Sequence, residues 1–108
     1  MRYALTLDLK DDPALIAEYE RHHAAVWPAI RQSILDAGIL DMEIYRIGNR
    51  LFMLMETTDA FSFEHKARLD ADNPVVQQWE ELMWTYQQAL PMAQPGEKWL
   101  RMARIFKL

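Results

Sequence analysis

Alternating apolar residues open the chain. Between positions 2 and 9 every second residue is large and apolar: Tyr3, Leu5, Leu7 and Leu9. This period of two is typical of a strand with one face against a core. Further along, Met42–Ile47 and Arg50–Thr57 are extended segments that flank Gly48-Asn49, which predicts a β-hairpin with a tight turn. The second segment is apolar on both faces over Leu51–Met55, so we expect it in the interior of a sheet.

Helical signals separate these strands. Asp12 and Pro13 suit the N-cap and the first position of a helix, which should run to about Ala37 before Gly38 ends it in a left-handed conformation. Trp27-Pro28 should kink this helix, because proline removes one backbone hydrogen bond. The remaining elements are expected to be a short helix over Phe61–Leu69, a helix from Asn73-Pro74 through Leu90, and a final strand from Trp99 to Lys107.

This order of elements is β-α-β-β-α-β, with an extra short helix before the second main helix. It predicts an α+β fold of the ferredoxin-like type, in which helices cover one face of a four-stranded antiparallel sheet. The length of 108 residues fits a single domain over residues 1–108. The uncovered sheet face would carry many large apolar side chains, and such a patch marks an interface. We therefore expect a homodimer that packs through the open sheet face, forming a dimeric α+β barrel.

Composition and charge narrow the classes of function. The formal net charge is −4, and the Lys and Arg residues form no basic stripe, which argues against nucleic acid and anionic membranes as partners. The sequence has no cysteine, so disulfides, thiolate metal sites and a cysteine nucleophile are excluded. Its longest apolar run, Leu51–Met55, is too short to span a bilayer. With no basic-then-apolar leader before the first strand, we expect a cytoplasmic protein.

Candidate chemistry lies on two of the expected helices. Tyr19, His23 and Trp27 are spaced four residues apart, so their side chains share one edge of the stripe that faces the sheet. His23 has two interpretations: a core histidine satisfied by a local hydrogen bond, or a group that exchanges protons near neutral pH. Trp79 likewise fits the core or a platform for the apolar face of a sugar, and the adjacent Glu80 fits a solvated helix face or a nearby polar contact.

Other catalytic and ligand-binding motifs are missing from the sequence. It contains no glycine-rich phosphate loop and no Gly-x-Ser-x-Gly elbow. His22 and His23 are adjacent, so on a helix they diverge by about 100° and are poorly placed to share a metal. His22 lies off the stripe and is expected to point to solvent. We therefore expect neither a metal nor a cofactor.

The segment Glu18–Pro28 resembles a helix of the L-rhamnose mutarotase family, in which a Tyr is followed four residues later by a His and after four more by Trp-Pro. Further matches are the hairpin from Ile44-Tyr45 to Leu51-Phe52, and Val76–Trp79 with Met83. The resemblance runs along nearly the whole chain in order and spacing. It implies a dimeric α+β barrel of ferredoxin-like subunits, which agrees with the architecture predicted above.

Residue by residue, the resemblance implies that His23 is the proton donor and that Tyr19 and Trp79 contact the sugar. Two positions of the family's sugar pocket depart from the rhamnose pattern: Glu80 replaces a second Trp, and Met42 replaces a Tyr. The segments Trp79–Met83 and Pro95–Trp99 resemble a branch linked with L-fucose. The expected substrate is therefore a monosaccharide, either L-rhamnose or L-fucose, both of which are 6-deoxy-L-hexoses.

The predicted function is a mutarotase, an isomerase that interconverts the α and β pyranose anomers of such a sugar. Ring opening needs an acid at the ring oxygen and a base at the C1 hydroxyl. His23 is the expected acid, Tyr19 orients the sugar or completes the proton relay, and Glu80, Glu43 or a water is the base. The alternative is a monooxygenase or small-ligand binding protein on the same fold, since the fold does not determine function. A non-catalytic dimeric module in which these side chains are only core is a third interpretation.

Overall fold

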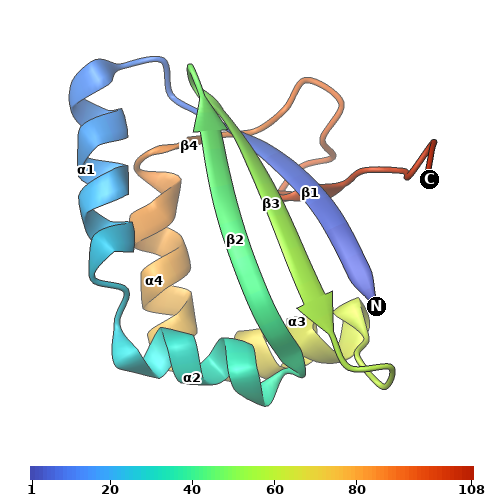
Figure 1. Cartoon of the computed structure of the whole chain (residues 1–108). Helices are drawn as coiled ribbons and strands as arrows, with labels where there is room; N and C mark the ends of the chain where they lie inside the picture. The colour runs from blue at the N-terminus through green and yellow to red at the C-terminus, as the bar shows by residue number, and fades with distance from the viewer.

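Strand β1 (Arg2–Leu9) lies in the interior of an antiparallel sheet whose order is β2-β3-β1-β4. The computed structural model describes all 108 residues (Figure 1). The hairpin strands β2 (Ile39–Ile47) and β3 (Arg50–Thr57) enclose the expected Gly48-Asn49 turn, and β3 pairs along nearly all of β1. The ferredoxin-like prediction and the interior position of β3 are confirmed. Within one chain the sheet is open and does not close on itself.

All helices lie on one face of this sheet (Figure 1). They are α1 (Pro13–Ala24), α2 (Pro28–Asp36), α3 (Phe63–Ala71) and α4 (Pro74–Trp84). Asp12 accepts hydrogen bonds from the first turn of α1, and Asn73 does the same for α4, each directly before a proline. The two cap-plus-proline signals in the sequence therefore start helices as expected.

The expected helix over residues 13–37 is two helices. Between them, Trp27 adopts φ −55° and ψ 134°, the extended conformation that a residue before proline favours. Figure 1 shows that α2 turns away from the direction of α1 after this break. Gly38 then follows α2 with φ +95°, so the predicted left-handed ending is confirmed.

Helix α4 ends earlier than the sequence predicts. The expected end was Leu90, but the helix ends at Trp84, and Gln87–Gln88 form the short strand β4. Leu9 pairs with Gln87, and the Lys10 amide donates to the Tyr86 carbonyl oxygen. Pairing with the free edge of β1 has therefore overridden the helical periodicity, although the predicted stripe residues Tyr86 and Leu90 are still buried.

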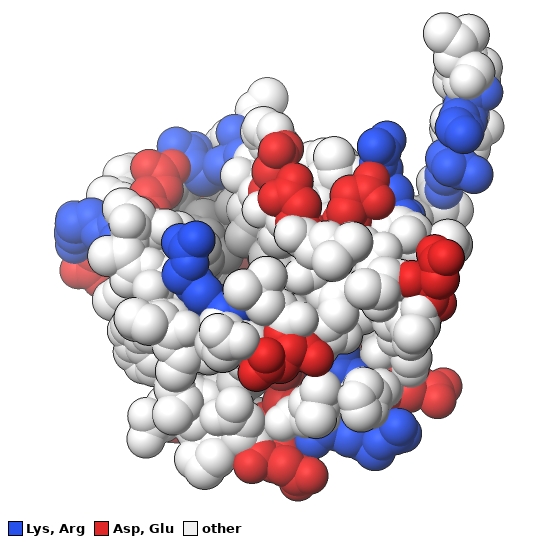
Figure 2. Space-filling model, turned by 60° about the horizontal axis from the view of Figure 1, so that its bottom comes forward, with Lys and Arg blue, Asp and Glu red and all other residues white.

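The expected final strand over residues 99–107 is reduced to β5 (Leu100–Arg101), which pairs with Leu5 and Thr6 of β1. One further hydrogen bond joins the Met102 amide to Ala4, and then the chain leaves the sheet. A strand needs a neighbour that pairs with its backbone, and residues 103–108 have none. Ile105 and Phe106 are 96% and 76% exposed, and this tail stands clear of the body in Figure 2.

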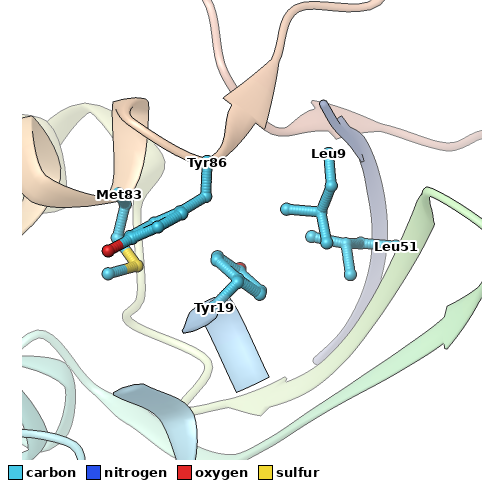
Figure 3. Close-up of a cluster of buried hydrophobic side chains, with 5 residues drawn as sticks. All are labelled: Leu9, Tyr19, Leu51, Met83 and Tyr86. Carbon is cyan, nitrogen blue, oxygen red and sulfur yellow. The ribbon is translucent and has the colours of Figure 1, made fainter. Parts of the chain in front are cut away.

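Two small clusters of buried side chains form the core between sheet and helices. One surrounds Tyr19 of α1, whose ring lies among Leu9, Leu51, Met83 and Tyr86 (Figure 3). The other consists of Leu5, Ile39, Met53 and Met55. Trp99, next to β5, packs against both clusters. The core therefore holds α1 and α4 against the middle of the sheet.

The opposite face of the sheet has no helix over it. Phe52, Leu54 and Leu100 are half-buried there, and Tyr45 and Ile47 are exposed. The ion pairs Arg2–Glu56 and Arg50–Asp8 flank these apolar residues. Charges of both signs are interspersed on the surface shown in Figure 2. None of the helices combines the length and apolar character that crossing a bilayer requires.

Candidate functional site

A cavity of about 670 Å³ lies between the helices and the inner face of the sheet. All of the predicted site residues line it: Tyr19, His23, Met42, Trp79 and Glu80. They come from α1, β2 and α4, which are far apart in sequence. A smaller cavity of about 490 Å³ lies between α1 and β2 and shares Tyr19 and His23 with the larger one.

His23 lies one turn after Tyr19 on α1, and the two rings stack at 4.2 Å between centroids. The His23 Nδ1–H donates to the Tyr19 carbonyl oxygen at 2.9 Å. Because Nδ1 carries the hydrogen of that bond, Nε2 of the neutral imidazole keeps its lone pair. Both sequence interpretations of His23 thus have support: the ring has a local backbone partner, and it still offers one nitrogen for proton exchange.

Burial controls the protonation of both groups. It lowers the pKa of His23 from its usual value of 6.5, and the neighbouring His22 acts in the same direction, while the bond to the Tyr19 carbonyl opposes them. Burial also raises the pKa of Tyr19 to about 12, against a smaller opposing effect of the Gln87 side chain. At neutral pH the site therefore pairs a neutral imidazole with a protonated phenol.

Trp79 of α4 faces Tyr19 and His23. Its ring lies 5.7 Å from that of His23 and 5.0 Å from that of Trp27, both in edge-to-face geometry. Trp27 lies in the break after α1, directly before the proline that begins α2, and its indole contacts Trp79 of α4. Of these rings, those of His23 and Trp79 line the cavity, and their edge-to-face contact is a geometry that aromatic side chains favour.

His22 does not point to solvent as the sequence predicted. Its Nε2 and the Tyr86 hydroxyl share a hydrogen bond of 3.1 Å, and the ring is half-buried. The early end of α4 explains the difference, because it brings Tyr86 back toward α1. His22 does not line the cavity.

The two candidate bases, Glu80 and Glu43, lie on opposite sides of the sheet. Glu80 is half-buried and lines the cavity, and its backbone carbonyl oxygen accepts a hydrogen bond of 2.8 Å from Lys98 Nζ. Glu43 instead lies on the opposite sheet face, where its carboxylate accepts a hydrogen bond from Tyr45. The structure thus removes Glu43 from the candidates. Met42 alternates with Glu43 and faces inward.

Several further cavity residues were not singled out from the sequence. Trp99 lines the cavity from the segment before β5, and Lys66 and Asp70 form an ion pair at its side on α3. Gln87 lines it from β4. The predicted helix through Leu90 hid Gln87, and no sequence signal distinguished it from Gln77, Gln78 or Gln88. No group of three or more His, Asp or Glu side chains is arranged to hold a metal ion.

The chain is similar in sequence to known sugar mutarotases. Residues 2–108 match the model of a family described as L-rhamnose mutarotase. A protein named L-fucose mutarotase from Xanthomonas campestris pv. campestris is 50% identical over 109 residues, covering 99% of this chain and 87% of the relative.

Two solved structures have the same fold as this chain. The crystal structure of an L-rhamnose mutarotase from Formosa agariphila superposes with a TM-score of 0.73 at 21% identity, covering 100% of this chain and 98% of that one. A dimeric ferredoxin-like protein from an uncultured marine organism gives 0.61 at 12% identity, covering 99% and 96%. At these identities the likeness concerns the fold.

The lowered pKa of His23 predicts a pH-dependent stability. The unfolded chain binds a proton at this position near pH 6.5, before the folded chain does. The stability due to neutral His23 is thus present above about pH 6.5 and is lost as pH falls through the lowered folded pKa. Thermal unfolding of wild type and His23→Gln should be measured from about pH 5 to about pH 8. The stability of wild type relative to that of the variant should increase as pH rises. A difference that does not change with pH would contradict this.

Proposed function

The chain belongs to the L-rhamnose mutarotase family, and we propose that its mutarotase reaction takes place in the large cavity between helices and sheet. As a mutarotase it is an isomerase that interconverts sugar anomers. One observation carries the proposed location: Tyr19, His23 and Trp79 come from two helices and line the same cavity. The substrate we propose is a 6-deoxy-L-hexose in its pyranose form.

The sequence favours His23 as the acid at the ring oxygen, but we propose it as the proton carrier at C1, because its lowered pKa leaves the imidazole neutral and able to accept a proton. Its Nε2 lone pair takes the proton of the C1 hydroxyl as the bond from C1 to the ring oxygen breaks, which leaves an aldehyde. After rotation about the bond between C1 and C2, Nε2–H returns that proton to the aldehyde oxygen as the ring closes on the other face. The imidazole is a base in opening and the proton donor in closure, so it ends the cycle unchanged.

Tyr19 completes the proton relay at the ring oxygen. Its protonated hydroxyl donates to that oxygen during opening and takes the proton back during closure, so no proton is gained or lost overall. Its raised pKa keeps the hydroxyl protonated at neutral pH. The neighbouring imidazolium, with its ring centroid 4.2 Å away, would stabilise the transient phenolate.

Trp79 is the proposed platform for the apolar face of the sugar, with Met42 opposite it on β2. Aromatic and apolar walls with a few polar groups are typical of small-molecule sites. The lining is mostly apolar, a feature that also suits the monooxygenase or ligand-binding alternative. A 6-deoxy sugar carries a methyl group that such a lining accepts, and family membership favours the mutarotase.

Loss of the imidazole should abolish most of the acceleration. For His23→Ala we expect the enzymatic rate of anomer exchange to fall roughly 100-fold or more, the usual contribution of a positioned proton-transfer group. Magnetisation-transfer NMR on L-rhamnose and L-fucose measures the exchange directly. His65→Ala is the matched control, because His65 is exposed on α3 and does not line the cavity. Full activity in His23→Ala would remove His23 from the mechanism.

Glu80 is the proposed determinant of sugar preference, and L-fucose is the proposed substrate. L-Fucose and L-rhamnose differ in the stereochemistry of their ring hydroxyls. The carboxylate of Glu80 accepts hydrogen bonds from hydroxyls, whereas an indole only donates. The likeness to the L-fucose mutarotase of Xanthomonas campestris supports the same substrate.

Glu80→Trp should therefore shift the ratio of kcat/KM for L-fucose over L-rhamnose toward rhamnose by about tenfold, the equivalent of one hydrogen bond. Glu81→Trp is the control, because Glu81 is the exposed neighbour on the same helix. An unchanged ratio in Glu80→Trp would show that other cavity residues select the sugar.

The uncovered sheet face is the proposed dimer interface, with a second copy of this chain packing sheet to sheet. The apolar group of Phe52, Leu54 and Leu100 with exposed Tyr45 and Ile47 supports this, since such a patch on a small protein marks an interface. The solved ferredoxin-like protein with the same fold is described as dimeric. Two open sheets packed in this way would form the α+β barrel.

Leu54→Asp tests this interface by placing a carboxylate at the centre of the apolar group. We expect wild type to sediment at twice the chain mass of 12.8 kDa, and the variant to dissociate with a Kd at least roughly 100-fold higher, because an unpaired charge is costly to bury. Leu69→Asp, on the exposed side of α3, should remain dimeric. A wild type that sediments as a monomer at micromolar concentration would refute the interface.

A further inference from the structure

Gln87 is a buried polar residue that the proposed reaction does not yet use. It lies on β4 opposite Leu9 of β1, is 4% exposed, and lines the cavity together with Tyr19 and His23. Its Oε1 is buried without a hydrogen-bond partner, the one buried side-chain atom of the protein in this condition. An unpaired buried acceptor costs roughly 1–3 kcal/mol, so its persistence calls for a reason.

The same side chain acts on Tyr19, with which it lines the cavity. The Gln87 amide lowers the pKa of the Tyr19 phenol, against the larger opposite effect of burial. An N–H group directed at a phenol oxygen has this effect, because it stabilises the phenolate. The Gln87 carbonyl oxygen is left as an acceptor without a partner.

We propose that Gln87 binds the sugar directly, with Oε1 accepting a hydrogen bond from a sugar hydroxyl. This inference deepens the proposed function and rests on it. A monosaccharide supplies what the site lacks, since each of its hydroxyls is a hydrogen-bond donor. Gln87 thus holds the sugar in the cavity that it lines together with Tyr19 and His23.

A purely structural role explains this side chain poorly. The pairing of β4 with β1 uses backbone groups, and it places Gln87 opposite Leu9, a member of the buried apolar cluster around Tyr19. An apolar residue of similar length would fill the same space without an unpaired oxygen. Polar groups that lower stability in the free protein and act on a ligand are typical of functional sites.

Gln87→Met provides the test, because methionine keeps the length and removes both polar ends. We expect KM for L-fucose and L-rhamnose to rise about tenfold, the equivalent of one lost hydrogen bond, with Tm equal to or above that of wild type. Gln88→Met is the matched control: this neighbour is exposed on the same strand and should keep wild-type KM. KM and kcat come from NMR exchange rates over a range of sugar concentrations, and Tm from thermal unfolding.

A structural role would give a different pair of results. If Gln87→Met lowers Tm and leaves KM unchanged, or changes neither, the inference is wrong although the mutarotase proposal stands. Gln87→Leu serves as a second apolar variant if the methionine variant folds poorly, with the same expectation for KM. A wild type that accelerates neither sugar would overturn the proposed reaction, and the role of Gln87 with it; this failure is visible before any variant is made.

Discussion

The burial of Tyr19 is the contact on which the rest of the structure depends. Its ring lies between the sheet residues Leu9 and Leu51 and the α4 segment that carries Met83 and Tyr86, so it joins three elements in one cluster. The same ring lines the cavity, and its carbonyl oxygen holds the imidazole of His23. Core and candidate site therefore share a residue, which keeps the proton-transfer groups on a rigid support. Packing at this point also raises the pKa of the phenol, so burial and chemistry have one cause.

The helical layer is interrupted beside the cavity, which Val26 of the break and Ile30 of α2 both line. A single helix from Pro13 to Ala37 would cover the sheet as a straight rod, whereas the break at Trp27-Pro28 sends α2 in a different direction. Trp27 and Trp79 meet there in edge-to-face contact. A proline in the sequence thus has a consequence well beyond the one hydrogen bond it removes.

The polar groups of the proposed reaction each have a defined environment. His23 is held by a backbone carbonyl, the buried Tyr19 lines the cavity with Gln87, and Glu80 lies near the partly buried amino group of Lys98. A mostly apolar lining strengthens electrostatic interactions within it, since the local dielectric constant is lower than that of water. A small set of side chains can then carry a proton-transfer reaction whose demands are modest.

The sequence by itself determined the elements that depend on local signals: the caps at Asp12 and Asn73, the turn at Gly48-Asn49, the ending at Gly38 and the stripe that joins Tyr19 to His23. From these the ferredoxin-like order and the side of the helices that faces the sheet could be predicted. Only the tertiary structure decided the end of α4, the strand at Gln87, the shortening of the final strand and the contact of His22 with Tyr86. These features depend on where the edge of β1 lies, and hydrogen bonding to an edge strand far away in sequence leaves no local pattern. The candidate site divides in the same way, because His23 follows from helical spacing whereas Gln87 enters the cavity only through sheet pairing.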